Sequence, residues 1–404
     1  MANVSSSNGL EKCPKLRFPG FDEPYRTTPL GEIASLVNRT DPKSNAPIMM
    51  LSAGNGFIMQ SEKYSRDNAG QSLKKYILLK QGELAYNHGA SKAKQFGCCY
   101  ELTEPEARIP YVYHCFKINE EEYTPYVAMA LNNAKMDQQL KRLVSSSVRM
   151  DGLLNISFED YMSVTLHLPS IIEQKQIADF LKKLDERIEF QESLLASLKK
   201  YKRGLLFDVL SEKRKITPNE WSTHQIGEFL TSKSIKQLPS IEAPLMAFTA
   251  TSGVCEKGER YDRGFLVKDA NTKLYKRTDY GDFIYSSNNL DVGSIGLNLY
   301  GTAVISDVYE IFSIENADRW FISEAIQQKT VMRNVLKYRQ GCLYGQYRIY
   351  ADDFLSVKVK LPSLKTQREI GKLFSQLERK IQREQCVLTS LELLRTSLLQ
   401  QLFI

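Results

Sequence analysis

The sequence predicts an α+β protein made of two tandem mixed α/β modules, each followed by one long α-helix. Three observations support this fold class: a long internal repeat, an uninterrupted helical pattern that closes each copy, and short β-type runs inside each module. The chain has 404 residues, of which 42% are hydrophobic. That share is enough for several buried cores and excludes a wholly disordered protein.

The internal repeat covers nearly the whole sequence. Leu168-Pro169-Ser170 recurs as Leu361-Pro362-Ser363, 193 residues later, and the two segments then align for 43 residues without a gap. Earlier blocks recur in the same order, so residues 82–86 (GELAY) return as residues 281–285 (GDFIY). Several blocks in one order argue against chance similarity and indicate a tandem duplication.

Each module combines short β-type runs with one later helical stretch. The runs lie between Gly- and Asn-rich turns, which is typical of strands joined by tight connections. The predicted strands cover residues 76–79, 84–86, 111–116, 283–285 and 308–314, and the predicted helical stretches cover residues 126–143 and 319–336.

A long helix follows each module. Pro169 precedes the first helix, and no proline occurs in the next 48 residues. Apolar residues then follow a 3-4 spacing for about five heptads, which predicts a seam that needs a partner helix, most simply its own copy. The residues expected to form this seam are Ile177, Leu181, Leu184, Ile188, Gln191, Leu195, Leu198, Ile370, Phe374, Leu377, Ile381, Glu384, Leu388 and Leu391.

Polar residues interrupt the seam at matching places in the two copies. Gln191 and Glu384 occupy equivalent a-type positions, and Lys202 and Arg395 occupy equivalent d-type positions. If the helices pair antiparallel about their midpoints, Gln191 and Glu384 should meet and fix the register. The alternative is that these residues face solvent or another chain where the helices separate.

The predicted organisation and charge follow from the repeat. The sequence predicts a flexible tail (1–16), a first module (17–167), a first helix (168–215), a second module (216–360) and a second helix (361–404). The net charge of +7 is uneven, because each helix segment carries +3 while the second module carries 0. A basic balance favours a nucleic-acid partner only weakly.

Several classes of protein lack support in the sequence. There is no run of about 18 apolar residues, no secretory signal at the first residues, and no CxxC pair among the seven cysteines. We therefore expect a cytoplasmic chain without a membrane span, a disulfide framework or a zinc site.

A catalytic site is also not indicated. The sequence contains neither a GxxxxGK[ST] phosphate loop nor the Asn/Asp-Pro-Pro-Tyr/Phe run expected of an amino-methyltransferase. Residues 173–175 (EQK) resemble a nuclease Glu-x-Lys, but their copy, residues 366–368 (TQR), could not hold a metal. The four histidines show no ligand spacing, so we expect no metal and no catalytic residue in this chain.

The residues and their duplicated order resemble one family, the specificity (S) subunits of type I restriction–modification systems, over essentially residues 15–404. Tyr25, where Trp is usual, and Lys365-Thr366 at the second helix start depart from the family pattern, and the latter leaves that helix's N-terminus open. The resemblance rests on residues 16–21 (LRFPGF), 30–33 (LGEI), the turns at Gly82-Glu83 and Gly281-Asp282, residues 168–178 with the helix that follows, and residues 398–403 (LLQQLF).

The resemblance implies the architecture and the partners. The modules would be target-recognition domains, and the helices would pack as an antiparallel coiled coil with pseudo-two-fold symmetry. Each domain would read one half of a bipartite DNA target, while the helices set the spacer and dock two methyltransferase subunits, which restriction subunits can join. S-adenosylmethionine, ATP and Mg would belong to those partners. A coiled-coil scaffold with protein-binding modules, or an autonomous nuclease, are the alternatives.

A protein domain that recognises a DNA sequence needs polar side chains that contact base edges and Lys or Arg side chains that contact phosphates. Candidate loops should therefore be polar, lie at equivalent places and differ between the copies. In the first copy the candidates are Asn87, His88, Ser91, Lys92, Lys94, Gln95, Ser145, Ser146, Ser147 and Arg149; in the second they are Ser286, Ser287, Asn288, Asn289, Lys337, Tyr338, Arg339, Gln340, Tyr344, Gln346 and Arg348. The alternative is that these are ordinary solvated loops.

Overall fold

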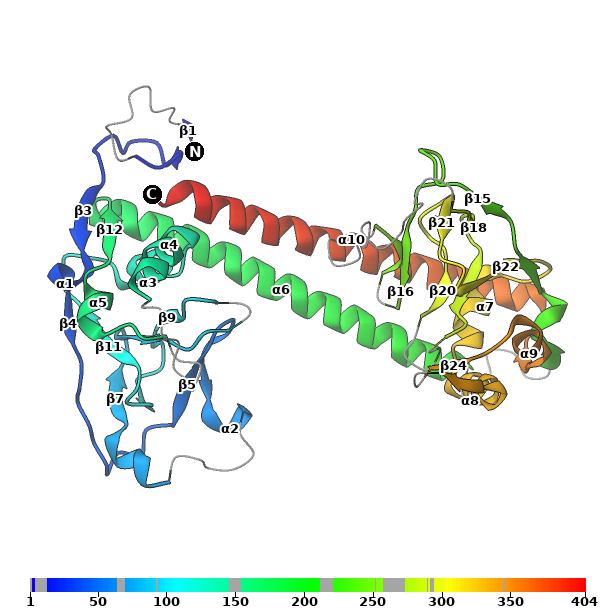
Figure 1. The fold of residues 1–404 in the computed structure, drawn as a ribbon, viewed down its shortest axis with the longest axis horizontal. Coiled ribbons are helices and arrows are strands. Elements are labelled where there is room, and N and C mark those ends of the chain that lie inside the picture. The colour runs from blue at the N-terminus through cyan, green and yellow to red at the C-terminus, as the bar shows by residue number, and fades with distance from the viewer. Residues whose placement is uncertain are drawn as a thin grey trace. The chain divides into compact units, whose positions relative to one another are not determined.

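The computed structural model describes residues 2–3, 13–63, 70–91, 94–144, 154–210, 221–250, 252–256, 273–288, 290, 294–343 and 346–404. The chain divides into two compact units, of which unit 1 comprises Met1–Glu192 with Val387–Ile404, and unit 2 comprises Ser193–Cys386. Each unit therefore contains one predicted module and about half of each long helix (Figure 1).

Unit 1 is organised around a four-stranded antiparallel sheet. Its strand order is β4 (Ala34–Leu36), β11 (His114–Ile118), β8 (Leu84–Asn87) and β9 (Cys98–Glu101). Leu84 and Tyr86 pack into a core shared with the helices, whereas Ala85 between them joins a second core on the other face. This alternation is the period of two that a strand imposes, and it buries both faces of the sheet.

Unit 2 repeats the same sheet. The order is β14 (Leu230–Lys233), β22 (Tyr309–Ile314), β19 (Phe283–Ser286) and β20 (Ile295–Leu297). Phe283 and Tyr285 face the helices, while Ile284 faces a second core. The registers also agree, because Leu84 pairs with Phe116 as Phe283 pairs with Phe312. The duplication predicted from the sequence is thus a duplication of one sheet.

Smaller strand pairs complete each unit. In unit 1 they are β1 (Ala2–Asn3) with β2 (Leu16–Arg17), β3 (Arg26–Pro29) with β12 (Thr165–Leu168), β5 (Met49–Ser52) with β6 (Gly56–Met59), and β7 (Ile77–Lys80) with β10 (Glu106–Ile109). In unit 2 they are β13 (Ser222–Gln225) with β25 (Lys358–Leu361), β15 (Lys236–Gln237) with β18 (Tyr275–Thr278) and β21 (Ala303–Ile305), β16 (Ala247–Thr249) with β17 (Gly253–Cys255), and β23 (Gln340–Leu343) with β24 (Gln346–Arg348).

Both predicted helical stretches are helical in the structure, and each consists of two consecutive helices. The first forms α3 (Thr124–Ala130) and α4 (Ala134–Leu143), and the second forms α7 (Arg319–Ile326) and α8 (Lys329–Val335). In unit 1 the side chain of Asn133 accepts hydrogen bonds from the backbone of residues 135 and 136 and caps α4. Such a cap starts a new helix rather than extending the previous one. The other short helices are α1 (Leu30–Ile33), α2 (Gln60–Lys63), α5 (Phe158–Met162), α9 (Ala351–Ser356) and the 3₁₀ turns Gly70–Lys75, Ile226–Glu228 and Leu336–Tyr338.

The two long helices are α6 (Ile171–Leu210) and α10 (Leu364–Leu402), and they begin at equivalent residues of the repeat. The backbone N–H of Gln174 donates to Ser170 O at 2.9 Å, and that of Gln367 donates to Ser363 O at the same distance. The second helix therefore starts as the first does, despite the Lys365-Thr366 substitution.

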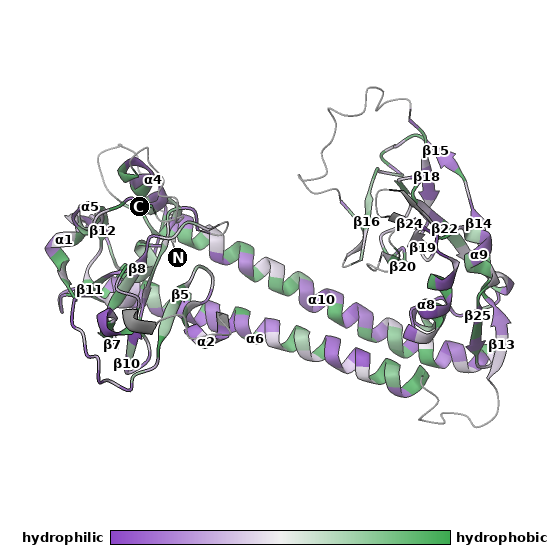
Figure 2. Ribbon diagram, turned by 60° about the horizontal axis from the view of Figure 1, so that its bottom comes forward, coloured by the Kyte–Doolittle hydropathy of each residue, from purple (hydrophilic) through white to green (hydrophobic). Residues whose placement is uncertain are grey.

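The helices pack antiparallel. In unit 1 the beginning of α6 shares a core with the end of α10, because Leu181 and Leu398 belong to the same buried cluster. All the residues expected in the seam are buried or half-buried, and Figure 2 shows polar and apolar residues alternating along both helices. Gln191 is 1% exposed, but Glu384 belongs to the other unit, so their expected meeting stays a prediction.

Lys202 and Arg395, which interrupt the seam, form ion pairs that are copies of one another. Arg395 bonds Asp185 on α6 in unit 1, and Lys202 Nζ lies 2.9 Å from Glu378 Oε2 on α10 in unit 2. Burial lowers the pKa of Lys202, but Glu378 and Glu324 (2.6 Å) outweigh that effect, so the pKa is raised above its usual value. Lys202 and Arg395 are thus each paired within their own unit.

Candidate nucleic-acid interface

A carboxylate turn precedes the strand that leads to the first candidate loop of each module. Gly82 and Gly281 have positive φ angles of 81° and 90°, a backbone conformation that glycine adopts without strain. The next residue closes the turn: Glu83 Oε2 accepts a hydrogen bond from Lys80 N at 2.8 Å, and Asp282 Oδ2 accepts one from Asp279 N at 2.7 Å. The Gly-Glu/Asp blocks therefore recur in the sequence because they build the same turn before the same strand.

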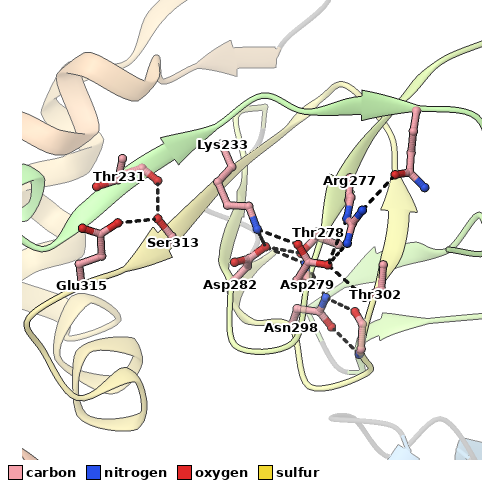
Figure 3. A network of polar contacts seen from close by, with 12 residues as sticks. Thr231, Lys233, Arg277, Thr278, Asp279, Asp282, Asn298, Thr302, Ser313 and Glu315 are labelled. Carbon is pink, nitrogen blue, oxygen red and sulfur yellow. Dashed lines mark hydrogen bonds and ion pairs between the residues drawn. The ribbon is translucent and has the colours of Figure 1, made fainter. Parts of the chain in front are cut away.

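Each turn carboxylate is neutralised by a cation from a neighbouring strand or its extension. In unit 1 this is Arg39, whose Nη2 lies 2.6 Å from Glu83 Oε1. In unit 2 it is Lys233, whose Nζ lies 2.6 Å from Asp282 Oδ2 and 3.0 Å from Asp279 Oδ2 (Figure 3). These charges are occupied within the fold, so we assign them to holding the turn rather than to contacting DNA.

An identical glutamine ties each module to its long helix. Gln174 is fully buried; its Nε2 donates to Pro169 O at 3.0 Å and its Oε1 accepts from Tyr123 N at 2.9 Å. Gln367 does the same, with Pro362 O at 2.9 Å and with Asp318 N at 3.2 Å. Tyr123 and Asp318 are the N-cap residues of α3 and α7. The glutamine therefore fixes the angle at which each module meets its helix.

Glu173, the first residue of the nuclease-like Glu-x-Lys, is part of a structural ion pair. Arg17 Nε and Nη2 donate to its two carboxylate oxygens at 2.9 and 2.8 Å, and the Tyr25 hydroxyl donates at 3.3 Å. Contact with Glu173 raises the pKa of Arg17. The bidentate geometry and complete burial of Glu173 explain why Arg17 and Tyr25 accompany it in the sequence.

In unit 2 the structure brings the two predicted loops together. Asn288, just after β19, forms an antiparallel bridge with Arg348 on β24. Next to it, Ile349 N donates to Ser287 O at 2.9 Å. Arg348 is 47% exposed, and its guanidinium lies 4.9 Å from the centre of the Tyr350 ring. The result is a surface at one end of the sheet with exposed Arg348 and Tyr350 beside half-buried Asn288, which suits a nucleic-acid interface.

In unit 1 the loop after β8 lies over a cluster of rings. The backbone O of His88 accepts from Leu154 N at 2.9 Å, and the His88 and His114 ring centres are 5.0 Å apart. Below them the rings of Tyr86 and Tyr161 stack at 3.9 Å. Burial lowers the pKa of His114, so its neutral form is favoured in the fold.

Two of the predicted DNA-contact residues have side chains that are buried in the structure. His88 is 9% exposed within the ring cluster, and Ser287 is 1% exposed with its hydroxyl donating to Val308 O at 2.8 Å. Neither side chain can reach a base in this conformation. Period-two alternation placed them beside the interface, but the sequence did not show that the chain folds back over them.

The other predicted residues fall into three groups. Side chains with hydrogen bonds inside the fold are Asn87, Ser91, Lys94, Ser286, Lys337 and Gln340. Gln95, Tyr338, Arg339 and Arg348 are exposed, and Asn288 is half-buried. Lys92, Ser145, Ser146, Ser147, Arg149, Asn289 and Tyr344 lie outside the described residues, as does the side chain of Gln346.

Residues that the sequence analysis missed lie beneath the loops. They are Lys276 on β18, Glu310 on β22, Tyr350 and, in unit 1, His114. Glu310 and Tyr350 contact the predicted Arg348, Lys276 contacts Glu310, and the His114 ring lies 5.0 Å from that of His88. Only Tyr350 is close in sequence to the residue that it contacts. Aligning the sequences of β11 and β22 would have pointed to His114 and Glu310, since both strands precede a predicted helix at the same point of the repeat.

Comparison with known proteins agrees with this geometry. Residues 30–200 match the family model described as the type I restriction modification DNA specificity domain. The fold of the chain is similar to that of a type I restriction–modification S subunit from M. genitalium, at 16% identity and a TM-score of 0.64, covering 97% of this chain and 99% of that one. An HsdS subunit from Thermoanaerobacter tengcongensis also matches, at 15% identity, 98% and 99% coverage and a TM-score of 0.41.

The family match covers the first module and the beginning of α6, whereas the fold similarity covers nearly the whole chain. Residues 30–200 are thus similar to a type I restriction modification DNA specificity domain, and the chain as a whole has a fold similar to that of a type I restriction–modification S subunit. Among the described residues, none of the helices combines the length and apolar character needed to cross a membrane.

Proposed function

We propose that the two modules read the two halves of a bipartite DNA target, with the long helices setting the spacer between them. One observation supports this most directly: the same sheet and the same carboxylate turn carry different loops in the two copies. Asn87 to Gln95 follow β8, whereas Ser286 to Asn288 follow β19. A conserved framework with divergent polar loops is what two readers of different half-sites require.

We propose further that α6 and α10 dock two methyltransferase subunits, which restriction subunits can join. Large apolar side chains lie exposed along both helices, where they do not stabilise the isolated chain. On α6 they include Phe190 (58% exposed) and Tyr201 (61%), and on α10 Leu393 (66%) and Leu394 (47%). Exposed apolar surface of this kind marks protein contacts. S-adenosylmethionine, ATP and Mg would then be bound by the partners, and the complex would act in the cytoplasm.

A gel-shift experiment tests DNA reading. The chain would be assembled with its cognate methyltransferase and selected against random duplexes, and the methylated sites would be mapped in cells with and without the gene. We expect two short half-sites separated by a fixed unspecified spacer. Binding without sequence selection, or a single undivided site, would contradict the proposal.

Co-purification tests the docking surface. Phe190→Ser and Leu393→Ser should each weaken methyltransferase retention at least tenfold while leaving the far-UV circular dichroism unchanged. Met59→Ser, at an exposed apolar residue outside the helices (39%), is the matched control and should retain the partner fully. Equal retention by all three variants would argue that docking lies elsewhere.

A further inference from the structure

A line of alternating charges runs from the interior of unit 2 to the interface surface. Lys276 on β18 is 12% exposed, and its Nζ lies 2.8 Å from Glu310 Oε2 and 2.8 Å from Tyr309 O. Glu310 on β22 is 14% exposed, and its other oxygen lies 3.6 Å from Arg348 Nη2. The carboxylate thus has one oxygen fixed by a buried ammonium group and the other directed toward an exposed arginine.

Arg348 is constrained from several sides. Its backbone is bridged to Asn288, its guanidinium lies against the Tyr350 ring, and Glu310 faces one of its terminal nitrogens. These contacts restrict a side chain that otherwise samples many rotamers. An arginine held in one orientation can donate two parallel hydrogen bonds to guanine O6 and N7, and prior ordering reduces the cost of binding.

The supporting position differs between the two modules. Glu310 pairs across the sheet with Tyr285, and in unit 1 the residue that pairs with the equivalent Tyr86 is His114. The contact at His114 is of a different kind, because its Nε2 lies 3.0 Å from the backbone oxygen Ile156 O. The framework is thus shared, whereas the residue that supports the loop is specific to each module.

We propose that Arg348 reads a guanine in the half-site bound by the second module, and that Glu310, held by Lys276, is the positioning residue that orients it. This inference rests on the proposed function, because it names a residue and a base within the DNA reading assigned above. It assigns the second module a G·C pair and gives Glu310 a role in specificity without contact with DNA.

The test uses the complete chain assembled with its methyltransferase, and a duplex library in which each base of both half-sites is varied in turn. Arg348→Ala should reduce discrimination at one G·C position of the second half-site by about 10- to 100-fold and leave the first half-site unchanged. Arg348→Lys should keep most of the affinity yet lose that discrimination, since a lysine cannot form the bidentate contact.

The positioning role is tested separately. Glu310→Gln should weaken discrimination at the same base, by less than Arg348→Ala does, and Glu310→Asp should restore part of it. Arg277→Ala is the matched control: this arginine of unit 2 is 39% exposed and bonds Asp279, so its loss should not alter base choice. The salt dependence of binding should stay the same in Glu310→Gln, because no phosphate contact is removed.

Three results would overturn the inference. A uniform loss of affinity at every base in Arg348→Ala would make Arg348 a phosphate contact, and unchanged base choice in Arg348→Lys would exclude bidentate reading. Equal effects of Glu310→Gln on both half-sites would show a structural role only. If the wild-type complex itself selected no site, the proposed function would fail instead, so the two failures are distinguishable.

Discussion

Removing the Glu173 carboxylate should destabilise unit 1 strongly, because it leaves a buried guanidinium without its partner. Arg17 is 5% exposed and Glu173 0%, and two hydrogen bonds of 2.8 and 2.9 Å join them. Breaking such a pair from one side costs about 3–5 kcal/mol. Glu173→Leu should therefore lower the free energy of unfolding of unit 1 by that amount. Because an apolar replacement of both partners is often near neutral, Arg17→Met/Glu173→Leu should recover most of the loss.

The repeat provides a matched control for this prediction. Thr366 occupies the position of Glu173 on α10, is 7% exposed, and its hydroxyl lies 3.1 Å from Ser363 Oγ. Thr366→Val removes one neutral hydrogen bond and should cost about 0.5–1.5 kcal/mol, in unit 2 only. The comparison separates the loss of a buried charge partner from the general effect of altering a helix start.

The assay must follow the two units separately. Both tryptophans, Trp221 and Trp320, belong to unit 2, so tryptophan fluorescence in urea reports that unit. Hydrogen exchange of peptides from β8 and β11, followed by mass spectrometry, reports unit 1. Glu173→Leu should increase exchange in unit 1 and leave the fluorescence midpoint nearly unchanged. A cost below about 1 kcal/mol, or a double variant as unstable as the single one, would refute the reasoning from buried charge.

Three further changes have defined outcomes. A Cβ at Gly371 would overlap the carboxylate of the α7 N-cap, so Gly371→Ala should lower the melting temperature. Gly204 is the control, because nothing lies within 4 Å of a Cβ at that position. Gly204→Ala should raise the free energy of unfolding by up to about 1 kcal/mol, as in an ordinary helix. Burial lowers the pKa of His114 in the folded protein, so as the pH falls the unfolded chain takes up this proton at a higher pH than the folded chain does. The free energy of unfolding should therefore be full above pH ~6.5 and fall as the pH drops through the pKa of the folded state. His114→Gln should flatten this pH dependence in urea titrations at pH 5 to 7. Iodoacetamide should modify exposed Cys386 within minutes but spare Cys98, whose buried thiol has its pKa raised to about 11; equal labelling in the native state would contradict the fold.

The sequence predicted the architecture well because the features that determine it are local and repeated. A heptad pattern of apolar residues predicts both long helices. Gln174 and Gln367 recur because each makes the same two hydrogen bonds. The break near Asn133 was missed because the residues on both sides favour a helix, and only the cap separates them. Local patterns identify elements, but they do not identify where an element must end to fit its neighbours.

The candidate interface could be predicted only in part from the sequence, since its contacts join residues that meet only after folding. The sequence suggested polar loops as candidates but not the contacts beside them, because Lys276, Glu310 and Arg348 lie on three different strands. It also included Ser287, which period-two alternation and the crossing of Ile349 bury. A polar residue in a loop is therefore a candidate reader only when the strand geometry leaves it exposed.

The two copies of the repeat are alike at some positions and different at others, and this pattern bears on how target choice is set. Residues that hold each module together, such as the turn carboxylates Glu83 and Asp282, are chemically alike in the two copies. The supports His114 and Glu310 occupy one position of the same sheet and differ in charge and in what they hold. If target choice is set at this level, exchanging the loop alone would misplace the reading side chains, whereas exchanging the loop with its support would transfer the half-site. Specificity in this fold is then a property of a loop and the strand residue beneath it, and the duplication allows each such pair to change independently.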